Sequence, residues 1–240
     1  MEQLSSEFRN YPFLTGEEFA EVCHHLERRY CQATLGPVRR QWKLRTCSAL
    51  NTSFALGPEN NTYLQIIRPL EGELDDGDLS SILESLSFGI SSARPDVEAD
   101  SNMLEAEAAD EAVLPKKPVK NTAGHVVYEI HLHPTYQAPC LWFSLHNLPN
   151  GEQAFDIDTV FRRLVPDQYK NGLRSAGGIG GISADHHPVT GLPSFFIHPC
   201  LIGEAMSNFD CSKENYLMVW LGLVGGCVGL WVPAEMALES

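Results

Sequence analysis

The sequence is short of basic residues, and it has neither a paired-cysteine motif nor an apolar leader. Its 17 lysines and arginines stand against 31 acids, and no cluster of them is interleaved with aromatics, so no nucleic-acid partner is expected. The seven cysteines are scattered without a CxxC pair, and residues 1–13 lack the apolar core of a signal peptide. These absences predict a cytoplasmic protein with free thiols.

The net charge of −14 is concentrated in one segment of the chain. Residues 71–111 hold thirteen acids and one base, a charge of −12, which leaves −2 for the remainder. Most of residues 71–121 is too polar to bury the apolar area that would offset its ordering entropy. One helix and two strands before it would make a poor core alone. We therefore predict a single domain over residues 1–240, with 71–121 a mostly flexible acidic insertion.

An amphipathic helix and four strands are indicated on either side of this insertion. Thr15 and Glu18 have the S/T-x-x-E spacing of a capping box, and apolar residues then recur at three- and four-residue steps as far as Tyr30. Alternating or β-branched patterns predict strands over residues 41–47, 63–70, 126–132 and 139–145, with a turn at Asn60-Asn61. The connection between the last two strands is too short for a parallel crossover, which predicts an antiparallel sheet.

Further elements follow these strands. We predict a helix over 156–164, an irregular glycine-rich stretch over 167–190, a buried strand over 194–197 and a short helix over 202–209. A last helix is predicted from Ser212 to Val232, and it includes 17 uncharged residues in a row. A membrane span needs about 20 apolar residues, so we expect this helix to be buried in the protein, where its glycines allow close packing on the sheet.

The segment around Cys200 is the strongest candidate for chemistry. Pro199 has no amide hydrogen with which to extend the preceding strand, so Cys200 lies just past a strand end. In an extended segment, residues two apart face the same side, which would bring the imidazole of His198 towards the sulfur. Spacing alone leaves this thiol open between a nucleophile and a cysteine buried at a strand end.

A zinc site is a second interpretation of the same region. Zinc needs three or four converging ligands at short, regular spacings. His186, His187 and His198 lie near Cys200 and Cys211 in the sequence. Adjacent histidines rarely bind one ion, so solvated loop histidines are the simpler explanation.

Two further interpretations have weaker support. A cysteine protease would need a histidine and an asparagine or aspartate close to its thiol. His131 and His133 are candidate partners, but nothing in the local sequence places them there. The glycine run at residues 177–181 lacks the Gly-Lys-Ser/Thr that completes a phosphate-binding loop, so we interpret it as a flexible loop close in sequence to Cys200.

Four blocks of sequence complete the pattern around Cys200. They are Tyr136–Phe143 (YQAPCLWF), His187–Pro193 (HPVTGLP), Phe195–Cys200 (FFIHPC) and Trp220–Gly225 (WLGLVG). Together they resemble the autophagy-related protein 10 family of ubiquitin-like-conjugating enzymes, over residues 126–233. The amino-terminal helix and the strand after Trp42 fit this family in kind and order, and the acidic insertion has no counterpart in it. The sister family, autophagy-related protein 3, has a histidine two residues after its cysteine, where this chain has Ile202.

The resemblance implies both a fold and a reaction. The fold is α+β and ubiquitin-conjugating-enzyme-like, with an antiparallel sheet and flanking helices. In the reaction, an activating enzyme (autophagy-related protein 7) passes autophagy-related protein 12 to Cys200 as a thioester, and a lysine of autophagy-related protein 5 then attacks it. The activating enzyme consumes the ATP, so neither a cofactor nor a metal is expected here. The implied location is the cytoplasm, including the site of autophagosome assembly; the alternatives are a sister-type enzyme and a non-catalytic adaptor.

The resemblance also implies two residues beside the thiol. Ordinary ubiquitin-conjugating enzymes supply an asparagine from a His-Pro-Asn segment, and this chain has none. In the family that it resembles, a strand tyrosine before a proline and the residue two before the cysteine stand near the thiol. These positions are Tyr136 and His198. We expect both to orient or stabilise the thioester carbonyl as negative charge develops on its oxygen.

Overall fold

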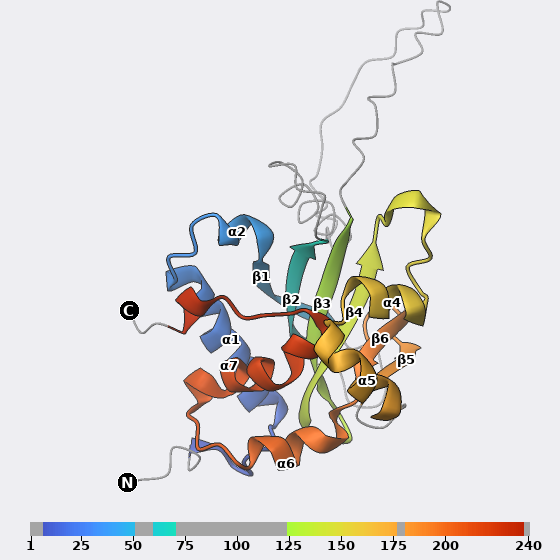
Figure 1. The fold of residues 1–240 in the computed structure, drawn as a ribbon. Coiled ribbons are helices and arrows are strands. Elements are labelled where there is room, and N and C mark those ends of the chain that lie inside the picture. The colour runs from blue at the N-terminus through green and yellow to red at the C-terminus, as the bar shows by residue number, and fades with distance from the viewer. Residues whose placement is uncertain (1–6, 51–59, 71–123, 177–180, 238–240) are drawn as a thin grey trace, which may run out of the picture.

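The computed structural model describes residues 7–50, 60–70, 124–176 and 181–237 (Figure 1). The predicted insertion at 71–121 and most of the glycine run at 177–181 lie outside these ranges. The helices are α1 (Gly16–Gln32), α2 (Val38–Gln41), α4 (Ile157–Arg163), α5 (Asp167–Ala176), α6 (Ile202–Met206) and α7 (Lys213–Val224). The strands are β1 (Lys43–Leu50), β2 (Asn60–Pro69), β3 (His125–His133), β4 (Ala138–His146), β5 (Ile182–His186) and β6 (Pro193–Ile197).

The six strands form one antiparallel sheet in the order β1-β2-β3-β4-β6-β5. Strands β3 and β4 pair along their whole length, from His125 opposite His146 to His133 opposite Ala138. The chain then leaves the sheet, returns as the edge strand β5 and turns back as β6, which lies between β4 and β5. The α+β architecture and the antiparallel sheet with flanking helices are therefore confirmed.

One face of the sheet is buried under the helices. Leu64, Ile130 and Leu141, from three neighbouring strands, have no exposed surface. Helix α1 packs on β1 and β2, α7 packs on α1, and Figure 1 places the helices on one side of the sheet. Because side chains alternate between faces, the opposite face carries polar residues, among them Gln65 and Glu129, which are paired across β2 and β3.

Helix α1 begins as its sequence predicts. The Thr15 hydroxyl accepts a hydrogen bond from the amide of Glu18, and the Glu18 carboxylate accepts one from the amide of Thr15. This reciprocal capping satisfies two donors that the helix cannot bond internally. The expected apolar stripe is buried and consists of Phe19, Val22, Cys23, Leu26 and Tyr30.

The prediction of an irregular stretch over residues 167–190 is wrong. This stretch contains helix α5 and strand β5. Helix α5 is mostly polar, and only Tyr169 and Leu173 pack against the core as partly buried apolar residues. Strand β5 is an edge strand with mostly exposed side chains, so its sequence shows no clean alternation. The turn predicted at Asn60-Asn61 is also wrong, because both residues belong to β2 and pair with β1.

The last helix is shorter than predicted. Helix α7 ends at Val224, and a 3₁₀ turn, η5 (Gly225–Val228), follows in place of the rest of the predicted helix. Gly229 then adopts a left-handed conformation with φ of 71°, which ends the turn. None of the helices in the described part of the chain has the length and apolar content needed to cross a membrane.

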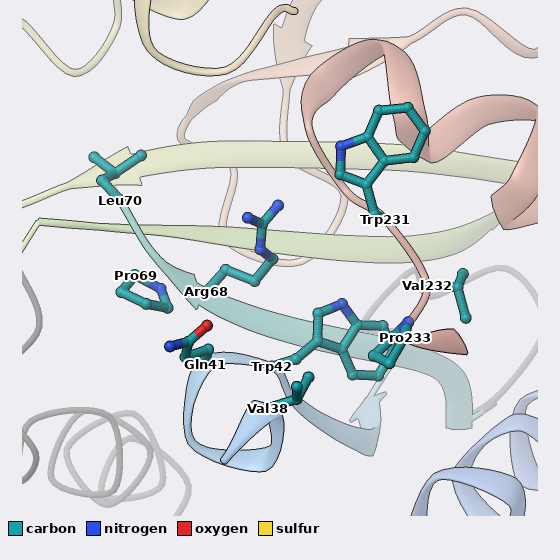
Figure 2. A pocket seen from close by; sticks show the side chains of 9 residues that line it. All are labelled: Val38, Gln41, Trp42, Arg68, Pro69, Leu70, Trp231, Val232 and Pro233. Atoms are coloured by element: carbon teal, nitrogen blue, oxygen red, sulfur yellow. The ribbon is translucent and has the colours of Figure 1, made fainter. Parts of the chain in front are cut away.

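A cavity of about 230 Å³ lies near the carboxy-terminal segment. Figure 2 shows Arg68 and Trp231 on its walls, with Trp42 below them. Its lining residue Pro69 pairs with His125 at the start of β3, whereas the turn after β3 lies eight residues further along that strand, roughly 25 Å away. The candidate chemistry described below lies at that other end and does not use this cavity.

The position of Gly225 provides a test of how helix α7 ends. A Cβ atom on Gly225 would fall against the backbone oxygen of Leu230, whereas one on Gly222 of α7 meets nothing within 4 Å. We expect Gly225→Ala to lower the free energy of unfolding by about 2 kcal/mol, as overpacking does. The control Gly222→Ala should raise it by up to about 1 kcal/mol, because alanine is the better helix former. Urea unfolding measures both, and equal effects would contradict the close packing of Gly225.

Candidate active site

Cys200 lies just past the end of strand β6. At its last residue, Ile197, β6 is paired with Leu141 of β4 on one side and with Ile182 of β5 on the other. The chain then turns into a short 3₁₀ helix, η4 (Pro199–Leu201), which contains Cys200. Cys200 is half-buried, and the following Leu201 is 57% exposed. The prediction that Cys200 lies just past a strand end is confirmed.

His198 does not reach the thiol in the way its spacing predicts. Residues 199–201 are helical rather than extended, so positions two apart do not face the same side. Instead, Nδ1 of His198 accepts a hydrogen bond of 3.2 Å from the backbone amide of Cys200. The backbone amide of His198 donates to the carbonyl of Gly181 at 3.3 Å, which ties this turn to the start of β5.

Tyr136 lies in the turn between β3 and β4, next to His198. Its ring meets the ring of His198 edge-on, with centroids 5.4 Å apart. Tyr136 is 36% exposed, so the residue is accessible to a partner molecule. The structure thus brings together Tyr136, His198 and the turn that carries Cys200, although the three come from separate parts of the sequence.

His133 belongs to this cluster, and sequence reasoning did not assign it there. Its ring lies 4.8 Å from the ring of Tyr136, and Nδ1 accepts hydrogen bonds from the amides of Thr135 and Tyr136 at 3.2 and 3.4 Å. Burial lowers the pKa of His133, and repulsion from a proton on the neighbouring His198 acts in the same direction. The signal that could have revealed it is the His-Pro pair at 133–134, which repeats at 187–188 and 198–199.

Other cysteines are less suited to chemistry with a protein partner. Cys140 is 1% exposed, donates to the carbonyl of Ile197 at 3.5 Å, and burial raises its pKa to about 12. Burial also raises the pKa of Cys227, to about 11. Cys31 is exposed, but it lies on helix α1. A thiolate is the reactive form, so raised pKa values make buried thiols inert.

The histidines do not form the zinc site that is the second interpretation of this region. Of the five residues considered for zinc, only His187 lies in a compact group of possible ligands among the described residues, and its neighbours there are Glu129 and His131. Both imidazoles donate from Nε2 to the same carboxylate oxygen of Glu129, at 2.9 Å from His131 and 2.8 Å from His187. Nδ1 of His187 accepts from the amides of Val189 and Thr190 at 3.3 Å.

The hydrogen bonds of His187 show whether Glu129, His131 and His187 form a metal site or a hydrogen-bond network. Because Nδ1 of His187 accepts hydrogen bonds, the proton of the neutral ring is on Nε2, the atom that a metal would need. The group is therefore a buried hydrogen-bond network on the polar face of the sheet. Although burial alone would raise the pKa of Glu129, the bonds from His131 and His187 hold it well below its usual range. Glu129 is thus the charged centre of the network.

Comparison with known proteins assigns the chain to a family. Residues 18–235 match the family described as "Autophagocytosis associated protein, active-site domain". A ubiquitin-like-conjugating enzyme ATG10 from Gibberella zeae is 61% identical over 96% of this chain and 98% of its own length. The chain is an ATG10-type ubiquitin-like-conjugating enzyme. ATG10 enzymes from Homo sapiens and Arabidopsis thaliana are 28% and 25% identical, over 58% and 55% of this chain and 59% and 61% of their own lengths.

The geometry suits an ATG10-type enzyme, because conjugating enzymes act on protein partners rather than on small molecules. The thiol, Tyr136 and His198 lie where β3, β4 and β6 meet their turns, beside the exposed Leu201. An open surface of this kind can receive a protein, which a closed pocket cannot. The protease interpretation loses its partners here, because His131 is bonded to Glu129 and Nδ1 of His133 is bonded within its own turn.

The buried network predicts how stability depends on pH. Burial lowers the pKa of His131 against the opposing pull of Glu129, so the folded protein keeps His131 neutral when the unfolded chain, with an ordinary value near about 6.5, has taken up a proton. The contribution of the neutral His131 to the free energy of unfolding is therefore complete above about pH 6.5, and it is lost as the pH falls towards the pKa of His131 in the folded protein.

We expect His131→Gln, which keeps a donor for Glu129, to unfold with a weaker pH dependence than the wild type between about pH 7 and 5. The measurement is urea unfolding at a series of pH values in that window. A constant difference between wild type and variant across the window would contradict a neutral, buried His131.

Proposed function

We propose that Cys200 carries autophagy-related protein 12 as a thioester and passes it to a lysine of autophagy-related protein 5. The observation that carries this proposal is the position of Cys200, half-buried beside the exposed Leu201 just past a strand end, in a chain 61% identical to an ATG10 conjugating enzyme over nearly all of both lengths. The activating enzyme that loads Cys200 is autophagy-related protein 7. The reaction takes place in the cytoplasm, at the site of autophagosome assembly.

The chemistry consists of two acyl exchanges. The Cys200 sulfur attacks the thioester of the activating enzyme, so a new carbon–sulfur bond forms, the old one breaks, and the released thiol takes the proton. The lysine amine then attacks the Cys200 thioester. An amide bond forms, the carbon–sulfur bond breaks, and the proton lost by the amine returns Cys200 to a thiol. A sulfur nucleophile that is also a good leaving group divides one difficult acylation into two easier steps.

Tyr136 and His198 have supporting roles in this proposal. Because Nδ1 of His198 is occupied by the amide of Cys200, the free edge of the neutral ring presents an Nε2–H donor. The Tyr136 hydroxyl is a second donor on an exposed side chain. Two neutral donors suit a thioester carbonyl whose oxygen gains negative charge during attack. We assign both residues to orienting and stabilising that oxygen.

Loading of Cys200 is tested on a non-reducing gel. Purified protein incubated with autophagy-related proteins 7 and 12 and ATP should give a thiol-sensitive adduct. Cys200→Ala should give none, and Cys200→Ser should give a thiol-resistant ester, because an oxygen ester does not exchange with thiols. Cys31→Ala is the control, since Cys31 is more exposed than Cys200 but lies on α1, and it should load like the wild type.

If the activating enzyme is charged but the wild-type protein forms no adduct, the proposal is wrong and a non-catalytic adaptor is the better description.

Tyr136→Phe and His198→Ala test the two donors. Each should slow transfer from preloaded Cys200 to autophagy-related protein 5 by roughly 10- to 100-fold. This factor is at or below the range known for the loss of one oxyanion-hole donor. Loading should suffer less, because the thiol is still present. The measurement is single-turnover discharge after ATP is removed. Normal transfer in both variants would remove Tyr136 and His198 from the mechanism.

A further inference from the structure

The same local arrangement occurs three times in this chain. In His133-Pro134-Thr135, His187-Pro188-Val189 and His198-Pro199-Cys200, Nδ1 of the histidine accepts a hydrogen bond from the backbone amide two residues later. The three distances are 3.2, 3.3 and 3.2 Å. The first two histidines also accept from the amide three residues later. The imidazole thus caps a tight turn, as an asparagine side chain does in an Asx turn.

Each cap fixes the form of its imidazole. A ring nitrogen that accepts a hydrogen bond carries no proton, so each of these neutral rings has its proton on Nε2. In the turn of His187, Nε2–H donates to Glu129 at 2.8 Å. Among the described residues, Nε2 of His133 and Nε2 of His198 have no such partner. Two of the three capped histidines therefore hold a free donor edge, and these two flank Tyr136.

Hydrogen bonds within the turn at residues 133–137 fix the backbone of Tyr136. The carbonyl of His133 accepts from the amide of Gln137 at 2.8 Å, while its ring binds the amides of Thr135 and Tyr136. Gln137 adopts a left-handed conformation with φ of 47°, which few non-glycine residues do without outside support. That support includes the amide of Leu14, which donates to the carbonyl of Gln137 at 2.7 Å.

We propose that His133 is a positioning residue for transfer of the modifier: by capping the 133–137 turn through Nδ1, it holds Tyr136 against His198 beside Cys200. This inference rests on the proposed function of Cys200. His133 acts through Tyr136 and does not itself touch the reacting atoms. Without the cap, the amides of Thr135 and Tyr136 lose their acceptor, and the exposed Tyr136 is no longer fixed by its own turn.

The test separates the cap from the rest of the side chain. Asparagine places an oxygen where histidine has Nδ1, so His133→Asn keeps the acceptor and removes the ring, whereas His133→Ala removes both. We expect His133→Ala to slow discharge of preloaded Cys200 to the acceptor lysine by roughly tenfold or more, because a small misplacement at a reacting centre is costly. His133→Asn should stay within about threefold of the wild type, since the turn survives.

Two controls test whether His133→Ala slows discharge only because it destabilises the fold. His187→Asn makes the same change in the turn that lies away from Tyr136, and because it also removes the bond to Glu129 it should lower stability to urea more than His133→Ala while slowing discharge less. The double variant His133→Ala/Tyr136→Phe should be no slower than Tyr136→Phe alone, because effects that run through one group do not add. An additive double variant, or a His133→Asn variant as slow as His133→Ala, would overturn the proposed role.

A spectroscopic measurement does not depend on the partners. Long-range ¹H–¹⁵N spectra of the full chain should show Nδ1 of His133 unprotonated at neutral pH, and a proton on Nδ1 would overturn the cap directly. The two levels of failure are distinct. A wild-type protein that cannot be charged would overturn the proposed function. Charged protein in which His133→Ala discharges normally would overturn only the role of His133.

Discussion

The placement of Cys200 depends on a seam of three residue pairs between β4 and β6. More than forty residues separate β4 from β6 in the sequence, and β6 places Phe195, Phe196 and Ile197 opposite Phe143, Trp142 and Leu141. Backbone bonds in so short a seam contribute only about 1 kcal/mol each. Stacked rings on both faces add to it: Trp142 on Phe196 at 4.7 Å on the polar face, and Phe143 on Phe195 at 5.9 Å in the core. This seam sets the turn of Cys200 beside the turn of Tyr136.

The polar face of the sheet supports the seam from the other side. Glu129 on β3 binds Nε2 of His187, whose turn begins the loop between β5 and β6, and the ring of His187 meets Trp142 edge-on at 5.6 Å. The charged carboxylate thus anchors the loop that leads into β6. Rigidity at the thiol comes from strand pairing and capped turns, and the cavity beside Trp231 takes no part in it.

The sequence is informative where one physical signal dominates. The capping box and apolar stripe of α1, and the β-branched runs of β3 and β4, predict those elements because burial on one face requires a regular period. Strand β5 gives no such signal, since an edge strand with exposed side chains needs no alternation. The end of α7 is equally hard to predict from the sequence, because the apolar run continues through Gly225. Only the fold shows that the close approach of Leu230 leaves no room for a side chain at Gly225. Tyr136 and His198 required a family resemblance, since their proximity is created by the fold and not by their spacing.

The capped histidine explains how a thioester can persist beside imidazoles. A free imidazole nitrogen next to Cys200 would be a general base, and it would activate water as readily as an incoming amine. In this site the basic nitrogen of His198 is held by the amide of Cys200, and that of His133 by the amides of Thr135 and Tyr136. What remains on each neutral ring is an N–H donor, which cannot remove a proton from water, and on the proposed function the donor of His198 stabilises charge on the carbonyl oxygen. On the proposed function, the activated bond therefore waits for a lysine that its own protein partner delivers.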